Sequence, residues 1–347
     1  MLRRTQLPFD VIGLVGCLRG SLMRRRDFVA LLGSVVVAKP LDAVAQNYPS
    51  RVVTIVVPYP AGGPTDTIAR ILADRMQGPL GQSVIIENVG GAGGSIGVGR
   101  VAHALPDGYT LSIGHTQTHV FNSAVLKLNY DVVNDFTPIS LIADTPIWIV
   151  SRKSLPADDL KGFIAWLKAS NGKATMGVAG IGSPSEFAAR IFAKETGTIF
   201  QFVPYRGGAP LLQDMIGDHV DFAFGQAAGY LTTVQSSQLK VFAVLQSNRW
   251  WAAPEVPTLD ELGLKNIDVS FWHGIWAPKG TPQNVIAKLN SAIRVSLADP
   301  VVQDRFKKVG QEIWPPEYQT PEALATKQKA EIARWTPIIL ESGMKVE

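Results

Sequence analysis

A glycine-rich turn between a short β-branched run and a helical pattern constrains this chain most. The run is Val52 to Val57, the turn is Pro58-Tyr59-Pro60-Ala61-Gly62-Gly63-Pro64-Thr65-Asp66, and Ile68, Ile71, Leu72 and Met76 follow with helical spacing. This order predicts a buried parallel strand and an amphipathic helix joined by the turn. Glycines let a ligand approach the backbone, and free amides at a helix start favour an anion. An ordinary tight connection would use the same residues, so the turn alone leaves both interpretations open.

Two common nucleotide sites are excluded at this turn. No Lys-Ser or Lys-Thr pair follows the glycines, as a P-loop requires, and the glycine spacing does not fit a dinucleotide fingerprint.

The first 45 residues predict an export signal. Met23-Arg24-Arg25-Arg26-Asp27-Phe28 leads into an apolar segment that ends near Ala38, and Ala43-Val44-Ala45 is typical of a cleavage site. The arginine pair followed by Asp27 and Phe28 is typical of a twin-arginine signal, so we expect a periplasmic protein. Leu14-Val15-Gly16-Cys17 resembles a lipoprotein cleavage box, but Asp10 interrupts its apolar stretch and a better signal follows, so lipid anchoring is not expected. Met1 and Met23 both stay open as the start.

Removal of this signal changes the charge of the chain. The full sequence has 33 basic and 29 acidic residues and a formal charge of +4, and residues 1–45 hold 7 basic and 3 acidic ones, which leaves 26 of each. A neutral mature chain gives no support to nucleic-acid binding. The single cysteine, Cys17, is removed as well, which excludes disulfides and cysteine chemistry. The remaining 302 residues suggest about two domains.

Strand and helix patterns alternate along the mature chain, which predicts mostly parallel sheets covered by helices. We expect two α/β lobes with the second inserted into the first: residues 46–148 plus 272–347 form lobe 1, and residues 149–271 form lobe 2. The chain then crosses between the lobes twice. Ligands in such folds bind at the carboxyl ends of strands, so the cleft between the lobes is the expected ligand site. The clearest expected helices are Leu160 to Ala169, Pro184 to Glu195 and Leu211 to Ile216.

A second turn with possible binding chemistry is Gly180-Ile181-Gly182-Ser183-Pro184-Ser185-Glu186. Ser183 and Glu186 have the spacing of a capping box, and Pro184 suits the first helical position, so capping explains most of the pattern. The functional interpretation is a second anion site that faces the first. Neither serine has the flanking glycines of a hydrolase nucleophile elbow.

Two further segments offer polar groups at strand ends. His115-Thr116-Gln117-Thr118-His119 follows a predicted strand and begins a loop, and no acidic ligand lies nearby, so we interpret it as a set of hydrogen-bond donors and not as a metal site. Arg206, after Tyr205, could hold a carboxylate or lie solvated in a turn. Trp272 and His273 lie in the expected crossover, where they could face the cleft.

Alternatives from other classes are weaker. A hydrolase would need a nucleophile with a base, and the serines and five histidines show no recognisable arrangement. The effector domain of a transcription factor would need a DNA-binding helix pair and no export signal. A sensor of the same ligand for a signalling system stays open.

Many ordered motifs resemble those of one family. They are Tyr48-Pro49, the Pro58 to Asp66 turn, Glu87-Asn88, Pro106-Asp107-Gly108-Tyr109, Asp135-Phe136-Thr137-Pro138, Val203-Pro204-Tyr205-Arg206-Gly207, Pro254-Glu255-Val256-Pro257-Thr258 and Ala277-Pro278-Lys279-Gly280-Thr281-Pro282. The mature chain resembles the Bug family of periplasmic solute-binding proteins, the receptors of tripartite tricarboxylate transporters.

The resemblance implies a type II-like, two-lobed periplasmic binding protein that closes on a small carboxylate and delivers it to membrane transporter subunits. It implies no catalytic residue, no cofactor, no metal and no nucleic-acid partner, and we expect a monomer. The ligand-binding residues that it implies are Tyr59, Ala61, Gly62, Gly63, Thr65, Asp66, His115, Thr116, Thr118, Gly182, Ser183, Ser185, Glu186, Tyr205, Arg206 and Gln226.

Two positions depart from the family pattern. Glu186 stands where relatives often have histidine, and Phe224-Gly225-Gln226 stands where many have Phe-Asp-Asn. The identity of the carboxylate therefore stays open between a dicarboxylate, a tricarboxylate and an aromatic acid, and the two departures do not favour an amino-acid ligand.

Overall fold

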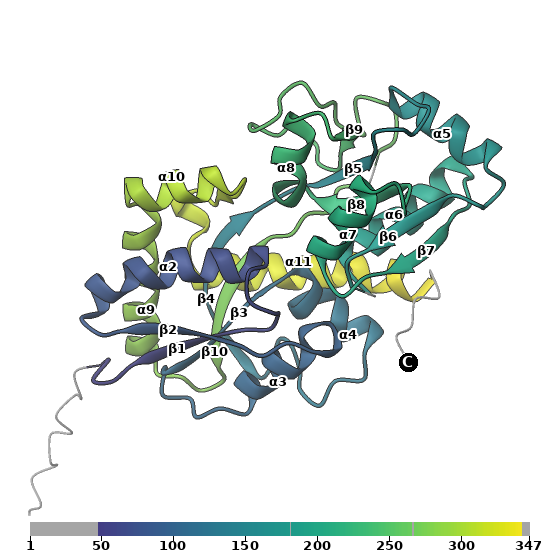
Figure 1. The fold of residues 1–347 in the computed structure, drawn as a ribbon. Coiled ribbons are helices and arrows are strands. Elements are labelled where there is room, and N and C mark those ends of the chain that lie inside the picture. Colours follow the sequence, from purple (N-terminus) through teal and green to yellow (C-terminus); the bar gives the residue numbers. More distant parts are fainter. Residues whose placement is uncertain (1–47, 181, 266, 342–347) are drawn as a thin grey trace, which may run out of the picture. The chain divides into compact units, whose positions relative to one another are not determined.

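The computed structural model describes residues 48–180, 182–265 and 267–341 (Figure 1). These residues form two β-sheets with helices packed against them. The predicted export signal, including Cys17 and both candidate start residues, lies outside the described residues. Within the described ranges, no helix combines the length and the apolar character needed to cross a membrane.

The first sheet holds six strands in the order β11-β4-β10-β3-β1-β2. β1 pairs in parallel with β2 and β3, and β10 runs antiparallel between β3 and β4. Val53, Ile55 and Val57 are fully buried, because helices cover this sheet and β-branched residues pack well on it. The strands are β1 (Val53–Val57), β2 (Val84–Asn88), β3 (Thr110–His115), β4 (Phe136–Asp144), β10 (His273–Pro278) and β11 (Glu312–Ile313).

The second sheet holds five strands in the order β7-β6-β8-β5-β9. β6 pairs in parallel with β7 and β8, whereas β5 runs antiparallel to β8 and β9. The strands are β5 (Ile147–Arg152), β6 (Thr175–Val178), β7 (Gln201–Pro204), β8 (Phe222–Gln226) and β9 (Leu239–Val244).

The prediction of mostly parallel sheets is wrong. Only two pairings in each described sheet are parallel, and β5 and β10 are antiparallel to all their neighbours. These are the strands that the chain forms directly after each passage between the sheets. A helical crossover brings the chain back to the end of the sheet where the previous strand began, so the next strand runs parallel to it. Only Thr145 and Pro146 separate β4 from β5, so no such return occurs there.

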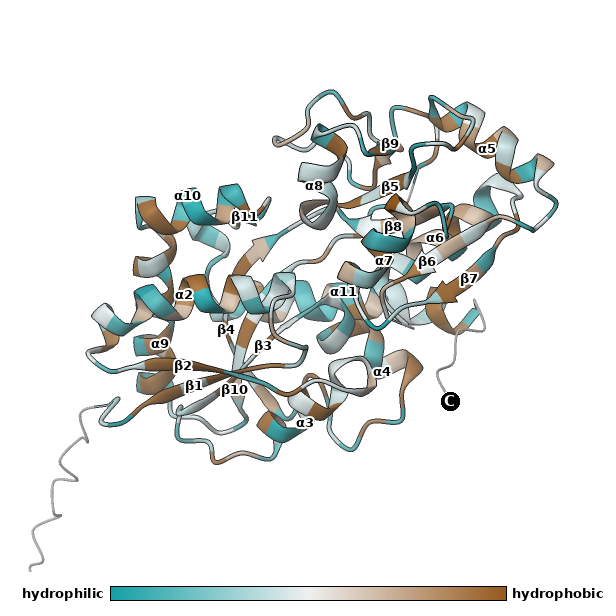
Figure 2. Cartoon of the chain, viewed as in Figure 1, coloured by the Kyte–Doolittle hydropathy of each residue, from teal (hydrophilic) through white to brown (hydrophobic). Residues whose placement is uncertain are grey.

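The helices begin and end on local signals. α2 begins at Pro64, and Gly81 in a left-handed conformation ends it and donates its N–H to Gln77 O. In Figure 2, helices such as α2 and α5 alternate between hydrophobic and hydrophilic residues, as partly exposed helices do. The helices are α2 (Pro64–Leu80), α3 (Ser95–Ala102), α4 (Asn122–Val125), α5 (Leu160–Ala169), α6 (Pro184–Thr196), α7 (Gly208–Ile216), α8 (Ala227–Gln235), α9 (Gln283–Leu297), α10 (Pro300–Lys308) and α11 (Pro321–Glu341), with short turns η1 (Ala92–Gly94), η2 (Gln117–Phe121) and η3 (Pro316–Tyr318).

Three aromatic side chains connect α6, which follows β6 of the second sheet, to η2, which follows β3 of the first sheet, and to α11. Phe187 of α6 meets Phe121 of η2 and Trp335 of α11, each at a ring-centroid distance of 5.2 Å. All three are buried. We call Phe121, Phe187 and Trp335 the aromatic junction. It places the first turn of α6 against the segment that follows β3.

The two connections between the sheets lie side by side. Pro146 forms an isolated antiparallel bridge with Ser270. Asp144 joins the two connections, because its carboxylate accepts from Ser270 Oγ at 3.0 Å and from Thr145 N at 2.8 Å. Burial raises the pKa of Asp144 to about 6, although the charge of Lys327 opposes the rise.

We predict that Asp144→Asn stabilises the protein above about pH 6. A carboxyl whose pKa is higher in the folded than in the unfolded chain binds a proton more tightly when folded. The free energy of unfolding of the wild type therefore falls as the pH rises from about 4 to about 6, because the stabilisation from the proton bound to Asp144 is lost. Asparagine still accepts from Thr145 N and can donate to Ser270 Oγ. Thermal unfolding should show a variant advantage that grows between about pH 4 and pH 7, to about 3 kcal/mol. An advantage that does not change with pH would contradict this account.

Candidate functional site

The turn between β1 and α2 leaves main-chain donors without helical partners. Gly63 is the N-cap of α2, and no side chain caps this end. Thr67 N donates to Gly63 O at 3.0 Å, which is the first helical hydrogen bond. Pro64 has no N–H, so the amides of Thr65 and Asp66 point out of the helix start without a helical acceptor. Gly62 lies in the left-handed region at φ +87° and turns the chain here.

The Asp66 carboxylate is occupied by protein donors. It accepts from Gly62 N at 2.8 Å, from Arg70 Nε at 2.9 Å and from Asn88 Nδ2 at 2.9 Å. Burial alone would raise the pKa of Asp66, but the hydrogen bonds from Arg70, Gly62 and Asn88 outweigh it and hold the pKa below its ordinary value. Asp66 is thus an ionised, paired group that shapes the turn. Its main-chain amide has no helical acceptor, whereas its carboxylate is paired within the protein.

Neutral imidazoles lie beside this turn. The Tyr59 ring stacks on His115 with centroids 5.0 Å apart, and His273 lies edge-on to His115 at 5.3 Å. His273 Nε2 is 3.2 Å from Thr65 Oγ1. Burial lowers the pKa of His115 well below its ordinary value and that of His273 to about 3, so both are neutral at pH 7. His115 Nδ1 accepts from Gln117 N at 3.2 Å, so its proton is on Nε2, which is left as a donor.

The segment after His115 is helical and not the predicted loop. Gln117–Phe121 forms a π-helical turn and α4 continues from it. Thr116 Oγ1 donates to Ser270 O at 2.8 Å, and Thr118 Oγ1 donates to His115 O at 3.1 Å. Both hydroxyls are therefore used inside the protein. The ligand role of Thr116 and Thr118 stays a prediction.

His119 faces the core of the first sheet. Its ring stacks on Trp276 at 3.7 Å, it is fully buried, and burial lowers its pKa to about 3. It therefore does not join His115 at a common ligand position. No group of three or more His, Cys, Asp or Glu in the described part of the chain has the arrangement of a metal site.

The polar groups of the turn between β6 and α6 form hydrogen bonds with one another. Ser183 Oγ accepts from Glu186 N at 3.3 Å, which confirms the predicted cap. The Glu186 carboxylate accepts from Gly182 N at 2.9 Å and from Arg190 Nε at 3.0 Å. Ser183, Ser185 and Glu186 are all buried. This helix start therefore keeps fewer free amides than the start of α2.

Parallel pairing brings the other predicted residues to the same edge of the second sheet. β6 lies between β7 and β8, so Tyr205 and Arg206 after β7 and Gln226 at the end of β8 flank the Gly182 turn. Tyr205 Oη donates to Asp214 Oδ2 at 2.8 Å, and burial together with that carboxylate raises the Tyr205 pKa to about 12. Arg206 is exposed.

The first sheet repeats this arrangement. β1 lies between β2 and β3, so Asn88 and His115 flank the Gly62 turn. Through the aromatic junction, the start of α6 packs next to the segment that follows His115. Each group of predicted residues thus lies at the carboxyl ends of the parallel strands of its own sheet, and Phe187 packs against the segment that follows His115.

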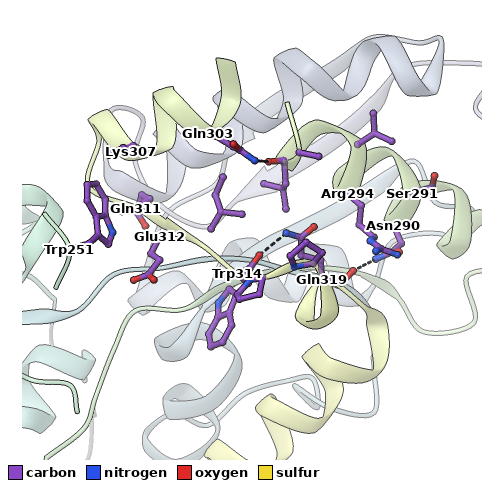
Figure 3. Close-up of a pocket in the computed structure, with 16 residues that line it drawn as sticks. Trp251, Asn290, Ser291, Arg294, Gln303, Lys307, Gln311, Glu312, Trp314 and Gln319 are labelled. Carbon is purple, nitrogen blue, oxygen red and sulfur yellow. Dashed lines mark hydrogen bonds between the residues drawn. The ribbon is translucent and has the colours of Figure 1, made fainter. Parts of the chain in front are cut away.

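Two pockets lie away from these turns. The pocket in Figure 3 has a volume of about 730 Å³ and lies along α9, α10 and β11, with Trp251, Arg294, Lys307 and Trp314 in its lining. Several of its polar groups hold the surrounding chain, as Asn290 Nδ2 does by donating to Gln319 O at 2.9 Å. The second pocket, of about 750 Å³, lies around Asn129 and Tyr130. None of the predicted site residues lines either pocket.

Sequence reasoning missed Arg70, Asn88 and Arg190 as partners of the two acidic groups, and it left His273 as a weak candidate. The arginines lie one helical turn after Asp66 and Glu186, so their spacing was a usable signal. His273 reaches Thr65 from a strand 208 residues further along the chain, and no local pattern predicts that contact.

Comparison with known proteins gives consistent matches over most of the chain. The family model for the tripartite tricarboxylate transporter family receptor (TctC) matches residues 68–344. A protein of Agrobacterium vitis, named the UPF0065 protein in the TAR-I ttuE-ttuC' intergenic region, is 40% identical over 324 residues, which is 93% of each chain. The structure of the periplasmic binding protein BugD has a TM-score of 0.80 and 37% identity, covering 86% of this chain and 100% of its own. MatC from Rhodopseudomonas palustris, solved with bound malate, has a TM-score of 0.79 and 36% identity, and the match covers 84% of this chain and 100% of the MatC chain.

Proposed function

Because the chain belongs to the TctC family of tripartite tricarboxylate transporter receptors, we propose that it captures a small organic carboxylate outside the cytoplasm and delivers it to a membrane transporter. The observation that carries this proposal is the uncapped start of α2. Its free amides at Thr65 and Asp66 lie beside a neutral His115 that offers its Nε2 proton. Malate in the related MatC structure supports a carboxylate as the ligand.

We assign the first carboxylate contacts to the turn that holds Ala61 and Gly63 and to the amides of Thr65 and Asp66. Ser185, Arg206 and Gln226 at the edge of the second sheet are proposed to read the far end of the ligand. Arg206 is exposed and suits a second carboxylate, because a guanidinium can form two parallel hydrogen bonds with it.

Capture is proposed to involve closure of the two lobes predicted from the sequence, residues 46–148 plus 272–347 and residues 149–271. The first border is moved to Pro146, because β5 of the second sheet begins at Ile147. The side-by-side connections at Pro146 and Ser270 suit a hinge, since a small rotation there moves one strand edge toward the other. Ligand contacts made only in the closed state would drive the change. The receptor is proposed to act as a monomer, without catalysis, after export by the twin-arginine route.

The acidic groups of the site favour ligands without an ammonium group. In the described parts of the two turns, the carboxylates of Asp66 and Glu186 are each paired with an arginine on the next helical turn. An ammonium would have to compete with a guanidinium for them. We therefore predict that hydroxydicarboxylates bind at least about tenfold more tightly than the amino acids of the same shape.

Calorimetry of residues 46–347 with matched pairs tests both the function and this preference. Malate against aspartate, and 2-hydroxyglutarate against glutamate, differ only in hydroxyl and ammonium. Succinate, adipate, citrate and benzoate extend the panel to other lengths and to an aromatic acid. No binding by any acid would reject the proposed function, whereas tighter binding of the amino acids would reject only the preference.

A further inference from the structure

Two segments 120 residues apart share one pattern. Gly62-Gly63-Pro64-Thr65-Asp66-Thr67-Ile68-Ala69-Arg70 and Gly182-Ser183-Pro184-Ser185-Glu186-Phe187-Ala188-Ala189-Arg190 agree in the glycine, the proline, a hydroxyl residue, an acid, an alanine and an arginine. Each segment follows the central strand of three parallel ones and begins a helix at its proline.

The contacts of the two segments are also the same. In each, the buried carboxylate accepts from the amide of the glycine four residues earlier and from the arginine four residues later. The glycine to acid distances are 2.8 Å for Gly62 and 2.9 Å for Gly182. Both glycines have positive φ, +87° and +74°, so the carboxylates hold turns that few other residues could adopt.

We propose that Asp66 and Glu186 are positioning residues that fix the two glycine turns, and that Arg70 and Arg190 cancel their charge so that an anion can bind at the same helix starts. This proposal rests on the proposed function and gives the carboxylates of Asp66 and Glu186 a structural role. The two turns then have the same construction, a glycine turn held by a paired acid and arginine, and each lies at the carboxyl ends of the parallel strands of its sheet.

The physical problem is a buried anion next to an anion site. The Asp66 and Glu186 side chains are 3% and 6% exposed, so water screens them poorly. Without a cation, each would repel a ligand carboxylate on the first-turn amides. Arg70 and Arg190 pair with these acids from side chains that are 52% and 36% exposed, while the amides of Gly62 and Gly182 bind the carboxylates from within the turns.

The two turns differ at one position that matters for binding. Gly63 leaves the start of α2 uncapped, whereas Ser183 uses its hydroxyl on Glu186 N. The first turn is therefore the more open anion site, and the second turn is held more rigidly. We infer that the ligand docks first on the Gly63 turn.

The test uses charge removal and rescue, with malate as the probe. Arg70→Met should weaken malate binding about tenfold at pH 7, because Asp66 is left buried and unpaired. Binding should recover as the pH falls toward 5, where the unpaired carboxyl takes up a proton. The double variant Asp66→Asn with Arg70→Met should bind within about threefold of the wild type, because no net charge remains. Arg190→Met with Glu186→Gln should behave in the same way at pH 7.

Arg75→Met is the matched control, because Arg75 lies on α2 but pairs with Asp299 away from the turn. It should leave malate affinity and its pH profile unchanged. A loss in Arg70→Met that is pH-independent and is not rescued by Asp66→Asn would overturn the charge argument, since a merely structural role predicts additive losses.

A ligand-free readout separates this proposal from the proposed function. In Asp66→Ala the Gly62 amide should exchange its hydrogen at least about tenfold faster, because its only side-chain acceptor is lost. Amides in the middle of α2 should not change. Unchanged exchange at Gly62 would reject the positioning role even if malate binds, and failure of the wild type to bind malate would count against the function while this measurement still decides the role.

Discussion

Gly63→Val should abolish ligand binding and leave the fold intact. Gly63 has φ −79° and ψ 171°, an extended conformation that valine adopts readily, and a Cβ there would meet only Pro60 O, at 3.8 Å. The valine methyls would cover the first-turn amides of Thr65 and Asp66. Loss of two charge-assisted hydrogen bonds, at about 1.5–3 kcal/mol each, corresponds to at least about a 100-fold loss of affinity.

Calorimetry with the acid that binds the wild type most tightly measures this loss. The midpoint of thermal unfolding should change by no more than about 3 °C, because valine costs at most about 1 kcal/mol more than glycine at an N-cap. Gly78→Val is the matched control, since Gly78 is exposed on the same helix with nothing within 4 Å of an added Cβ. Full affinity in Gly63→Val would show that the turn is only a connection.

Local signals made much of the fold predictable. The helix from Leu160 to Ala169 has the predicted ends, because its apolar spacing and its cap are written in neighbouring residues; Asp159 Oδ1 accepts from Gly162 N at 2.7 Å. The family resemblance and the two-lobed α/β class are confirmed by the family model and by the solved relatives. Both depended on motifs spread over the whole chain, which are more specific than any single turn.

The direction of strands could not be predicted in the same way. β5 and β10 are apolar runs like the parallel strands beside them, and their antiparallel placement depends on how the chain passes between the sheets. β11 has only two residues, Glu312 and Ile313, and no strand pattern marks it. These features result from long-range pairing and not from local preference.

In the candidate site, too, some features follow from local sequence and others depend on long-range packing. The free helix start at Gly63 follows from glycine, proline and the absence of a capping side chain, all visible in the sequence. The ligand role carried over to Asp66 and Glu186 did not account for Arg70 and Arg190, although the repeated spacing was visible. The contact between Thr65 and His273 depends on packing between distant strands.

Phe187→Ala should destabilise the protein strongly and weaken ligand binding. Phe187 is fully buried in the aromatic junction, where it meets Phe121 and Trp335 at 5.2 Å each. Truncation of a buried phenylalanine costs about 3–5 kcal/mol, because it leaves a cavity as well as losing apolar burial. For a chain of this size the midpoint of thermal unfolding should fall by about 10 °C.

The effect on binding shows whether Phe187 aligns the two turns or only contributes to core packing. Phe187 follows Glu186 in the first turn of α6, so its loss should loosen the second turn relative to the segment after His115 and reduce affinity about tenfold at a temperature where the variant is folded. Phe192→Ala is the matched control, because Phe192 is equally buried on α6 but packs on Phe163 and Phe224 within the second lobe. It should lose similar stability and keep its affinity. Equal losses of affinity in both variants would mean that binding follows overall stability, and that the aromatic junction has no particular part in aligning the two turns.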